Sequence, residues 1–382
     1  MKWAADKVLG SLGKDRVILV LVGILLCAFF VASADFSNRG QPHLFDVERA
    51  VVRQVLGESI WPDHYIPEVY VGTQRLELEI LTGDFSGEVL EAENLLSRFH
   101  SYPAAMGDQI LVSVLPDASH VAMYNIGVYG VHRFPVIAFA LVLLAIAMVA
   151  IGRKKGLYAM VSLAFTLTIV VFLLVNGIVA GGSPIWLGLL TAFLTTTFSL
   201  LMVCGAGKQA LSSIVGTVIG LFFAGVFSLV FSNLGSVSGI HLDGARQILY
   251  HSPEDTTVLI SQLFFAAVII SASGACVDAS ISVSSTLFEM KSRQPDTTEK
   301  SLFKSAMIIG SDVLGANANT LILALTGASL PIMVLIGLFG FPALRLLNLD
   351  VIAIEGISAV SAAMGMIASV PATAFFSARL AK

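Results

Sequence analysis

The chain has 382 residues, of which 56% are hydrophobic and only 13% are charged, and its mean hydropathy is +0.86. This composition excludes an ordinary soluble globular domain. No Arg/Lys-rich or low-complexity tract suggests binding to nucleic acid. The formal net charge of −4 is uninformative, because in a membrane protein the positions of the charges matter more than their sum.

The first apolar run, Val17–Ala34, follows a cluster of basic residues and ends in the small residues Ala32-Ser33-Ala34. It is interpreted either as an uncleaved membrane anchor or as a signal peptide that is cleaved after Ala34. Both interpretations place residue 35 outside the cytoplasm. Residues 1–34 are therefore expected to form the cytoplasmic N-terminus and this anchor or signal peptide.

Residues 35–133 form the only long hydrophilic segment, with 14 acidic residues against six arginines and no lysine. Within it, the run Leu76–Ile80 alternates apolar and acidic side chains, as a strand with one buried face does. Further short alternating runs are separated by glycine- and proline-containing turns. We expect an extracytoplasmic all-β domain, a small barrel of the OB or lipoyl-like kind, between the first and second spans.

Residues 134–382 are expected to form an all-α polytopic membrane bundle, with eight or nine transmembrane helices in the whole chain. Two basic loops, Arg153–Lys155 and Lys291–Lys304, are assigned to the cytoplasm by the positive-inside rule. The prolines and glycines of 331–347 favour a broken or re-entrant piece there. The expected spans after the first are Phe134–Ile151, Leu157–Ala180, Pro184–Gly205, Ala210–Phe231, Thr257–Val277 (with a more polar continuation to about Met290), Ser305–Gly327, Pro331–Leu347 and Gly356–Ala378.

Two of these spans carry a carboxylate, Asp278 in the sixth and Asp312 in the seventh. An ionised side chain in hydrocarbon costs roughly 3 kcal/mol or more unless it is paired, hydrated or protonated. Ser282 lies one turn after the first aspartate, and Asn317 and Asn319 follow the second. Hard oxygen and amide ligands of this kind suit a small cation, and a carboxylate pair suits a proton. These residues are the candidate ion, proton or substrate site, and the carboxylates are expected to face a common interior.

The alternative for both aspartates is structural: each caps a broken helix or binds serines across a helix interface. Glu355, before the last span, either lines the same cavity or caps the N-terminus of its helix. The sequence Ile309-Gly310-Ser311-Asp312 lacks the second glycine of intramembrane aspartyl proteases, and no serine elbow, Walker loop or HExxH helix is present. We therefore expect no enzymatic activity, no catalytic residues, no metal ligands and no cofactor.

Two further features have simple interpretations. Gly216 and Gly220 form a GxxxG motif, which is a helix-packing face. The residues His241, Asp243, His251, Glu254 and Asp255 cluster in one expected outer loop, but their spacing is too loose for a zinc site. The three cysteines lie in apolar runs and do not suggest a disulfide.

The chain resembles the YibE/F-like family of bacterial membrane proteins. The resemblance rests on Gly274–Ser280 (GACVDAS), Ile309–Gly315 (IGSDVLG), Asn319–Ala324, Ser369–Ala374 and, in the hydrophilic segment, Glu79–Gly83 and Gly107–Val112. It implies an anchor, a small outer domain and a multi-span bundle in the cell membrane. Ser311 stands where a basic residue is common, which removes a possible partner for Asp312. The resemblance implies an architecture and no particular activity.

Together these features favour a gradient-driven secondary transporter or ion-permeation protein with Asp278 and Asp312 at its coupling site. Its expected partners are the lipid bilayer and a proton or small cation, with a homo-oligomer as a further possibility. The alternative is a non-catalytic membrane scaffold or sensor, whose outer β domain binds a protein partner or an envelope component.

Overall fold

The computed structural model describes residues 47–116, 124–240, 256–340 and 348–381, with a few isolated positions between them. The expected anchor or signal peptide, Val17–Ala34, lies outside these residues. The chain divides into two compact units between Ala147 and Met148. The domain boundaries expected from the sequence, after residues 34 and 133, stay predictions.

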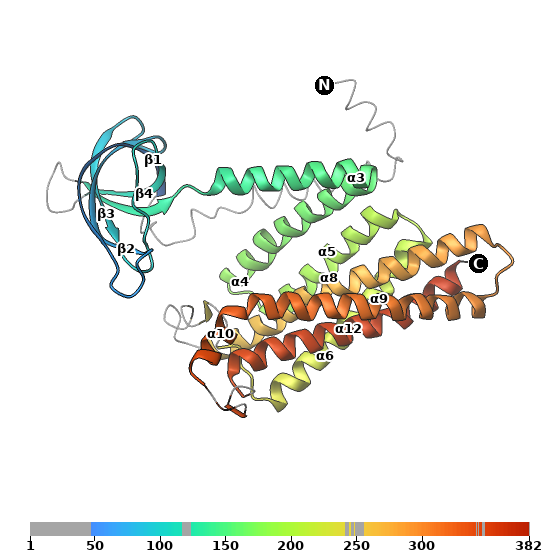
Figure 1. The fold of residues 1–382 in the computed structure, drawn as a ribbon. Helices are drawn as coiled ribbons and strands as arrows, with labels where there is room; N and C mark the ends of the chain where they lie inside the picture. Colours follow the sequence, from blue (N-terminus) through green and yellow to red (C-terminus); the bar gives the residue numbers. More distant parts are fainter. Residues whose placement is uncertain are drawn as a thin grey trace, which may run out of the picture. The chain divides into compact units, whose positions relative to one another are not determined.

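The first unit contains a closed five-stranded barrel (Figure 1). Its strands are β1 Val47–Pro62, β2 Tyr70–Ile80, β3 Val89–Leu96, β4 Gln109–Pro116 and β5 Tyr124–Val131. They follow one another around the barrel in the order β1-β2-β3-β5-β4. All neighbouring strands are antiparallel except β3 and β5, which are parallel. Five strands in a Greek-key arrangement are typical of an OB fold, so the expected small β barrel is confirmed.

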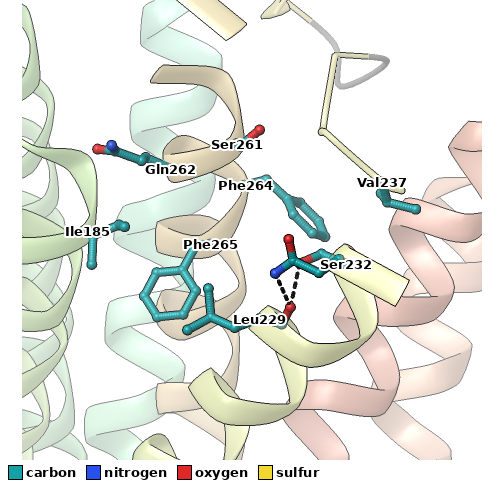
Figure 2. Close-up of a pocket in the computed structure, with 9 residues that line it drawn as sticks. Ile185, Leu229, Ser232, Val237, Ser261, Gln262, Phe264 and Phe265 are labelled. Carbon is teal, nitrogen blue, oxygen red and sulfur yellow. Dashed lines mark hydrogen bonds between the residues drawn. The ribbon is translucent and has the colours of Figure 1, made fainter. Parts of the chain in front are cut away.

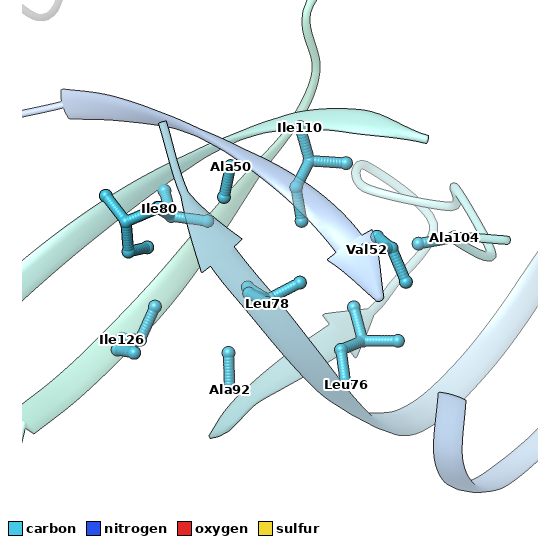
Figure 3. Packing of buried hydrophobic residues seen from close by; sticks show 10 residues of the cluster. Ala50, Val52, Leu76, Leu78, Ile80, Ala92, Ala104, Ile110 and Ile126 are labelled. Atoms are coloured by element: carbon cyan, nitrogen blue, oxygen red, sulfur yellow. The ribbon is translucent and has the colours of Figure 1, made fainter. Parts of the chain in front are cut away.

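The barrel interior is filled by aliphatic side chains that the alternation of the sequence turns inward (Figure 3). On β2, Leu76, Leu78 and Ile80 are buried, while the acidic residues between them are only partly buried. The same alternation on β1 buries Ala50 and Val52 against them. On β1 and β2, alternate side chains therefore point into the barrel, as the period of two requires.

The second part of the chain is helical. Six helices among the described residues are long and apolar enough to cross a membrane. The helical elements are α3 Phe134–Ile169 with its continuations η1 Val170–Val175 and α4 Asn176–Val179, α5 Pro184–Cys204, α6 Lys208–Leu234, α8 Thr256–Arg293, α9 Glu299–Ala328, α10 Leu330–Leu338 and α12 Asp350–Leu380. The expected total of eight or nine spans is therefore not confirmed.

Besides the first expected span, which lies outside the described residues, two differences from the sequence prediction account for the count. The two spans expected at Phe134–Ile151 and Leu157–Ala180 occur as one helical stretch, Phe134–Val179. This stretch is broken at Arg153, whose backbone is non-helical (φ 48°, ψ −124°). In the expected span 331–347, α10 has only nine residues, about 14 Å of helix, which is too short to cross a bilayer.

The helical core lies where α6, α8 and α12 meet, and small residues let these helices approach closely. A methyl group at Gly220 of α6 would lie 2.7 Å from the backbone oxygen of Gly365 on α12 and 3.0 Å from the sulfur of Cys276 on α8. A methyl group at Gly216 would likewise collide with Thr373 of α12. The GxxxG motif is therefore a packing face, as predicted.

Candidate functional site

The candidate residues from the sequence lie mainly on two neighbouring helices. Asp278 and Ser282 belong to α8, and Asp312, Asn317 and Asn319 belong to α9. Asp278, Asp312 and Asn319 are exposed within the described part of the chain, whereas Ser282 and Asn317 are half-buried. The carboxylates thus lie on outer faces of the two helices, not in the enclosed interior expected from the sequence.

The helical contacts fix the relative height of the two aspartates. A methyl group at Gly310 of α9 would lie 3.5 Å from a side-chain carbon of Val283 on α8, so these residues are level. The two helices run in opposite directions because only residues 294–298 connect them (Figure 1). Asp278 lies five residues before Val283 on α8, and in antiparallel helices the residue level with it on α9 lies five residues after Gly310, which is Gly315. Gly315 and Asp312 are three residues apart, or roughly 5 Å along the helix axis. The two carboxylates are therefore within about one turn of each other along the helices.

Neither carboxylate has a hydrogen bond or ion pair to another residue that the structure describes. The hydroxyl of Ser282 donates to the backbone oxygen of Asp278 over 2.8 Å, one turn back on its own helix, and does not reach the carboxylate. The neighbours of Asp312 on its face of α9 include the exposed Ile308 and the small residue Gly315. Each aspartate is thus available to a proton, a water molecule or an ion.

The interior faces of the same helices carry hydroxyl groups in place of carboxylates. Ser280 of α8 accepts hydrogen bonds from Thr217 of α6 and Thr373 of α12, each over 3.0 Å. One turn further along, Ser213 donates to Ser284 over 2.7 Å. All of these side chains are buried. Hydroxyls that satisfy one another across three helices tighten the interface without introducing charge.

This hydroxyl cluster was not predicted from the sequence, although a signal for it exists. Ser280 and Ser284 recur four residues apart on α8, in step with Gly216 and Gly220 on α6. The polar stripe that contains Asp278 follows the same period on the neighbouring face. Periodicity alone did not indicate which of the two stripes faces the core.

Glu355 lies apart from the two aspartates. It is half-buried near the start of α12, and its neighbour Ile354 packs with Phe264 and Val268 of α8. These α8 residues precede Asp278 by ten residues or more, roughly 15 to 20 Å along the helix. Glu355 therefore does not join the pair on α8 and α9.

A cavity of about 300 Å³ opens where α5, α6 and α8 meet (Figure 2). Its lining includes Ile185, Asn233, Gln262 and Phe265, and the amide of Asn233 donates to the backbone oxygen of Leu229 over 2.6 Å. Neither aspartate lines it. Gln262 precedes Asp278 by sixteen residues, roughly 24 Å of helix, so this cavity does not serve the candidate site.

No cluster of three or more His, Cys, Asp or Glu side chains suited to a metal ion occurs among the described residues. The expected outer-loop group, His241, Asp243, His251, Glu254 and Asp255, lies outside them.

A small β barrel joined to several apolar helices, two of which carry Asp278 and Asp312, defines a multi-pass membrane protein with a separate hydrophilic domain. The family model for YibE/F-like proteins matches residues 140–382, which is more than half of the chain. The chain therefore belongs to the YibE/F-like family, as its sequence motifs indicated. No curated protein and no solved structure matches it.

Proposed function

We propose that this protein is a non-enzymatic, gradient-driven transporter or ion-permeation protein in which Asp278 and Asp312 carry the coupling proton or small cation. The observation that carries the proposal is the position of these unpaired carboxylates, about level with each other on two helices that are apolar enough to span a membrane. A carboxylate in such a position is stable only when it is protonated, hydrated or bound to an ion. The same requirement makes it a carrier of protons or cations.

The proposed topology follows from the charges. The basic residues around the break at Arg153, and those between α8 and α9, face the cytoplasm. The barrel then lies on the extracytoplasmic side of the cell membrane. Eight spans satisfy this pattern when Val17–Ala34 is an anchor, α3 crosses twice and α10 does not cross.

A flux assay tests the coupling role. The full chain is reconstituted in vesicles, a potassium gradient with valinomycin imposes a potential, and an enclosed pH-sensitive dye reports proton flux. Asp278→Asn and Asp312→Asn abolish the flux, while Asp296→Asn, in the loop between α8 and α9, leaves it unchanged. Full flux in both membrane variants would show that the aspartates do not couple transport.

A second copy of the chain is the proposed cover for this acidic face, because acyl chains cannot solvate it. Gly274 on α8 and Gly315 on α9 are open, with no atom within 4 Å of an added methyl group, and small residues permit close helix approach. In a variant without the native cysteines, Gly315→Cys forms an oxidative cross-link between copies. Phe222→Cys, on an exposed face of α6, serves as the control and forms no cross-link. Equal cross-linking of both variants would contradict this assignment.

The alternative, a scaffold or sensor, is favoured by a different observation: charged groups are absent from the buried α6–α8–α12 interface within the described residues. A tightly packed core of this kind suits a protein whose outer barrel does the binding. Wild-type vesicles that conduct neither protons nor sodium ions would support the scaffold over the transporter.

A further inference from the structure

One end of the barrel exposes large apolar and aromatic side chains. We call it the barrel tip: the β1–β2 loop (63–69), the β3–β4 loop (97–108) and the strand ends beside them. Tyr65 is 76% exposed and Phe99 is fully exposed. The exposed apolar residues of the tip are Trp61, Tyr65, Ile66, Tyr70, Phe99 and Met106. Exposed apolar patches of this kind mark an interaction surface.

Hydrogen bonds between two loops hold the barrel tip in shape. The carboxylate of Asp63 is buried and accepts hydrogen bonds from the backbone amides of Tyr65 and Ile66, over 2.8 and 3.2 Å. From the other loop, the Nε of Arg98 donates a hydrogen bond to the same carboxylate over 2.7 Å. The guanidinium carbon of Arg98 also lies over the Tyr65 ring, 5.2 Å from the ring centroid. The aromatic side chains are therefore presented by two loops that are fixed to each other. Such preorganisation lowers the entropic cost of binding.

The strand order places the barrel tip beside the exit of the chain into α3. Trp61, near the end of β1, pairs with Val71 of β2, and the next residue of β2 pairs with Leu96 at the end of β3. β5 runs parallel to β3, so it also ends at the tip, where His100 lies against Gly130. Only two residues separate the end of β5 at Val131 from the start of α3 at Phe134. They reach at most about 7 Å.

We propose that the barrel tip inserts its aromatic side chains into the interfacial layer of the bilayer that α3 enters. Tryptophan and tyrosine favour this layer because one part of the ring system is apolar and another forms hydrogen bonds. A linker of two residues keeps the tip at the membrane surface, where a soluble partner has little room. The inference rests on the proposed membrane architecture and is independent of whether Asp278 and Asp312 conduct ions.

Depth-dependent fluorescence quenching tests this contact in the full chain. Trp3→Phe and Trp186→Phe leave Trp61 as the single tryptophan. The protein is reconstituted in phosphatidylcholine vesicles with or without bromine on the acyl carbons nearest the headgroup. We expect Trp61 to lose about half of its emission or more in brominated lipid, as a residue in the interfacial belt does, and to be protected from aqueous acrylamide.

A matched control uses the opposite end of the barrel. In the same background, Trp61→Phe is combined with Val89→Trp, because Val89 begins β3 and its exposure of 53% is close to the 57% of Trp61. This variant should have equal emission in the two lipids. Equal emission of Trp61 in both lipids, with strong quenching by acrylamide, would overturn the proposal and indicate a binding surface in water. Quenching of both positions by bromine would also overturn it, because contact would not be specific to the tip. Proton flux in the same vesicles reports separately on the transport proposal.

Discussion

Thr373 of α12 donates a hydrogen bond to Ser280 of α8 over 3.0 Å, and both side chains are fully buried. Ser280 also accepts a hydrogen bond from Thr217 of α6, so one hydroxyl group links three helices. The centre of the bundle is therefore held by neutral groups that satisfy one another. The carboxylates lie outside this centre, which separates the groups that stabilise the bundle from those that we propose to carry ions.

Ser280→Ala should lower the free energy of unfolding by about 1 kcal/mol, because two buried hydroxyls lose their shared acceptor. Thermal or chemical unfolding of the detergent-solubilised protein measures the change. Ser271→Ala, at an exposed position on the same helix, is the control and should change stability by less than about 0.5 kcal/mol. Equal effects of the two substitutions would contradict a stabilising role for the hydroxyl cluster.

Gly220→Val should destabilise the bundle by about 3 kcal/mol or more, because the added carbons meet the backbone of α12 and cannot be accommodated by a side-chain rotation. The matched control is Gly356→Val on α12, where no atom lies within 4 Å of an added methyl group. Its cost should stay within about 1 kcal/mol. The yield and unfolding temperature of the purified variants distinguish the two. A stable Gly220→Val protein would show that α6 and α12 are not in close contact.

The stability of the barrel should fall in acid through Asp63. The hydrogen bond from Arg98, aided by the Tyr65 amide, lowers the pKa of this carboxyl below its usual value of 3.8. A carboxyl with a lower pKa in the folded state adds stability above about pH 4, and this contribution disappears as the pH falls through the folded pKa. Trp61 emission during unfolding, measured from pH 6 to pH 3 in the variant with that single tryptophan, reports the change.

Asp63→Asn should lower the stability of the barrel at pH 6 and flatten this acid dependence, because the ionised acceptor is gone. Asp84→Asn, in the β2–β3 loop at the other end of the barrel, should keep the wild-type profile. An unchanged profile in Asp63→Asn would mean that the ion pair with Arg98 does not fix the barrel tip.

Local patterns in the sequence predicted most of the fold. The alternation in Leu76–Ile80 specified a strand with one buried face, and the long apolar runs specified helices close to the observed α5, α6, α8, α9 and α12. The order of the strands was not predictable, because the β3–β5 and β1–β4 pairings join residues far apart in the sequence. The break at Arg153 was predicted as a cytoplasmic loop, but the sequence did not reveal that the helix is interrupted at a single non-helical residue.

The candidate site was only partly predictable for a related reason. Charge in an apolar span identified Asp278 and Asp312 as unusual, and helix periodicity placed Asp278 on one stripe of its helix. Both stripes of α8 are polar and contain small residues, however, so the sequence did not distinguish the core-facing Ser280 from the exposed Asp278. Only the contacts with α6 and α12 decide between them, and those contacts are non-local.

Replacing the aspartates by leucine tests whether they act in stability or in function. Neither carboxylate has a hydrogen-bond partner to lose within the described residues, and leucine is compatible both with a helix and with lipid. Asp278→Leu and Asp312→Leu should therefore leave the unfolding free energy unchanged or raise it by up to about 1 kcal/mol, while removing proton flux. A gain in stability with a loss of activity is the behaviour of groups retained for function. A loss of stability comparable to that of Ser280→Ala would instead assign the carboxylates to helix packing, and the proposed coupling site would lose its main support.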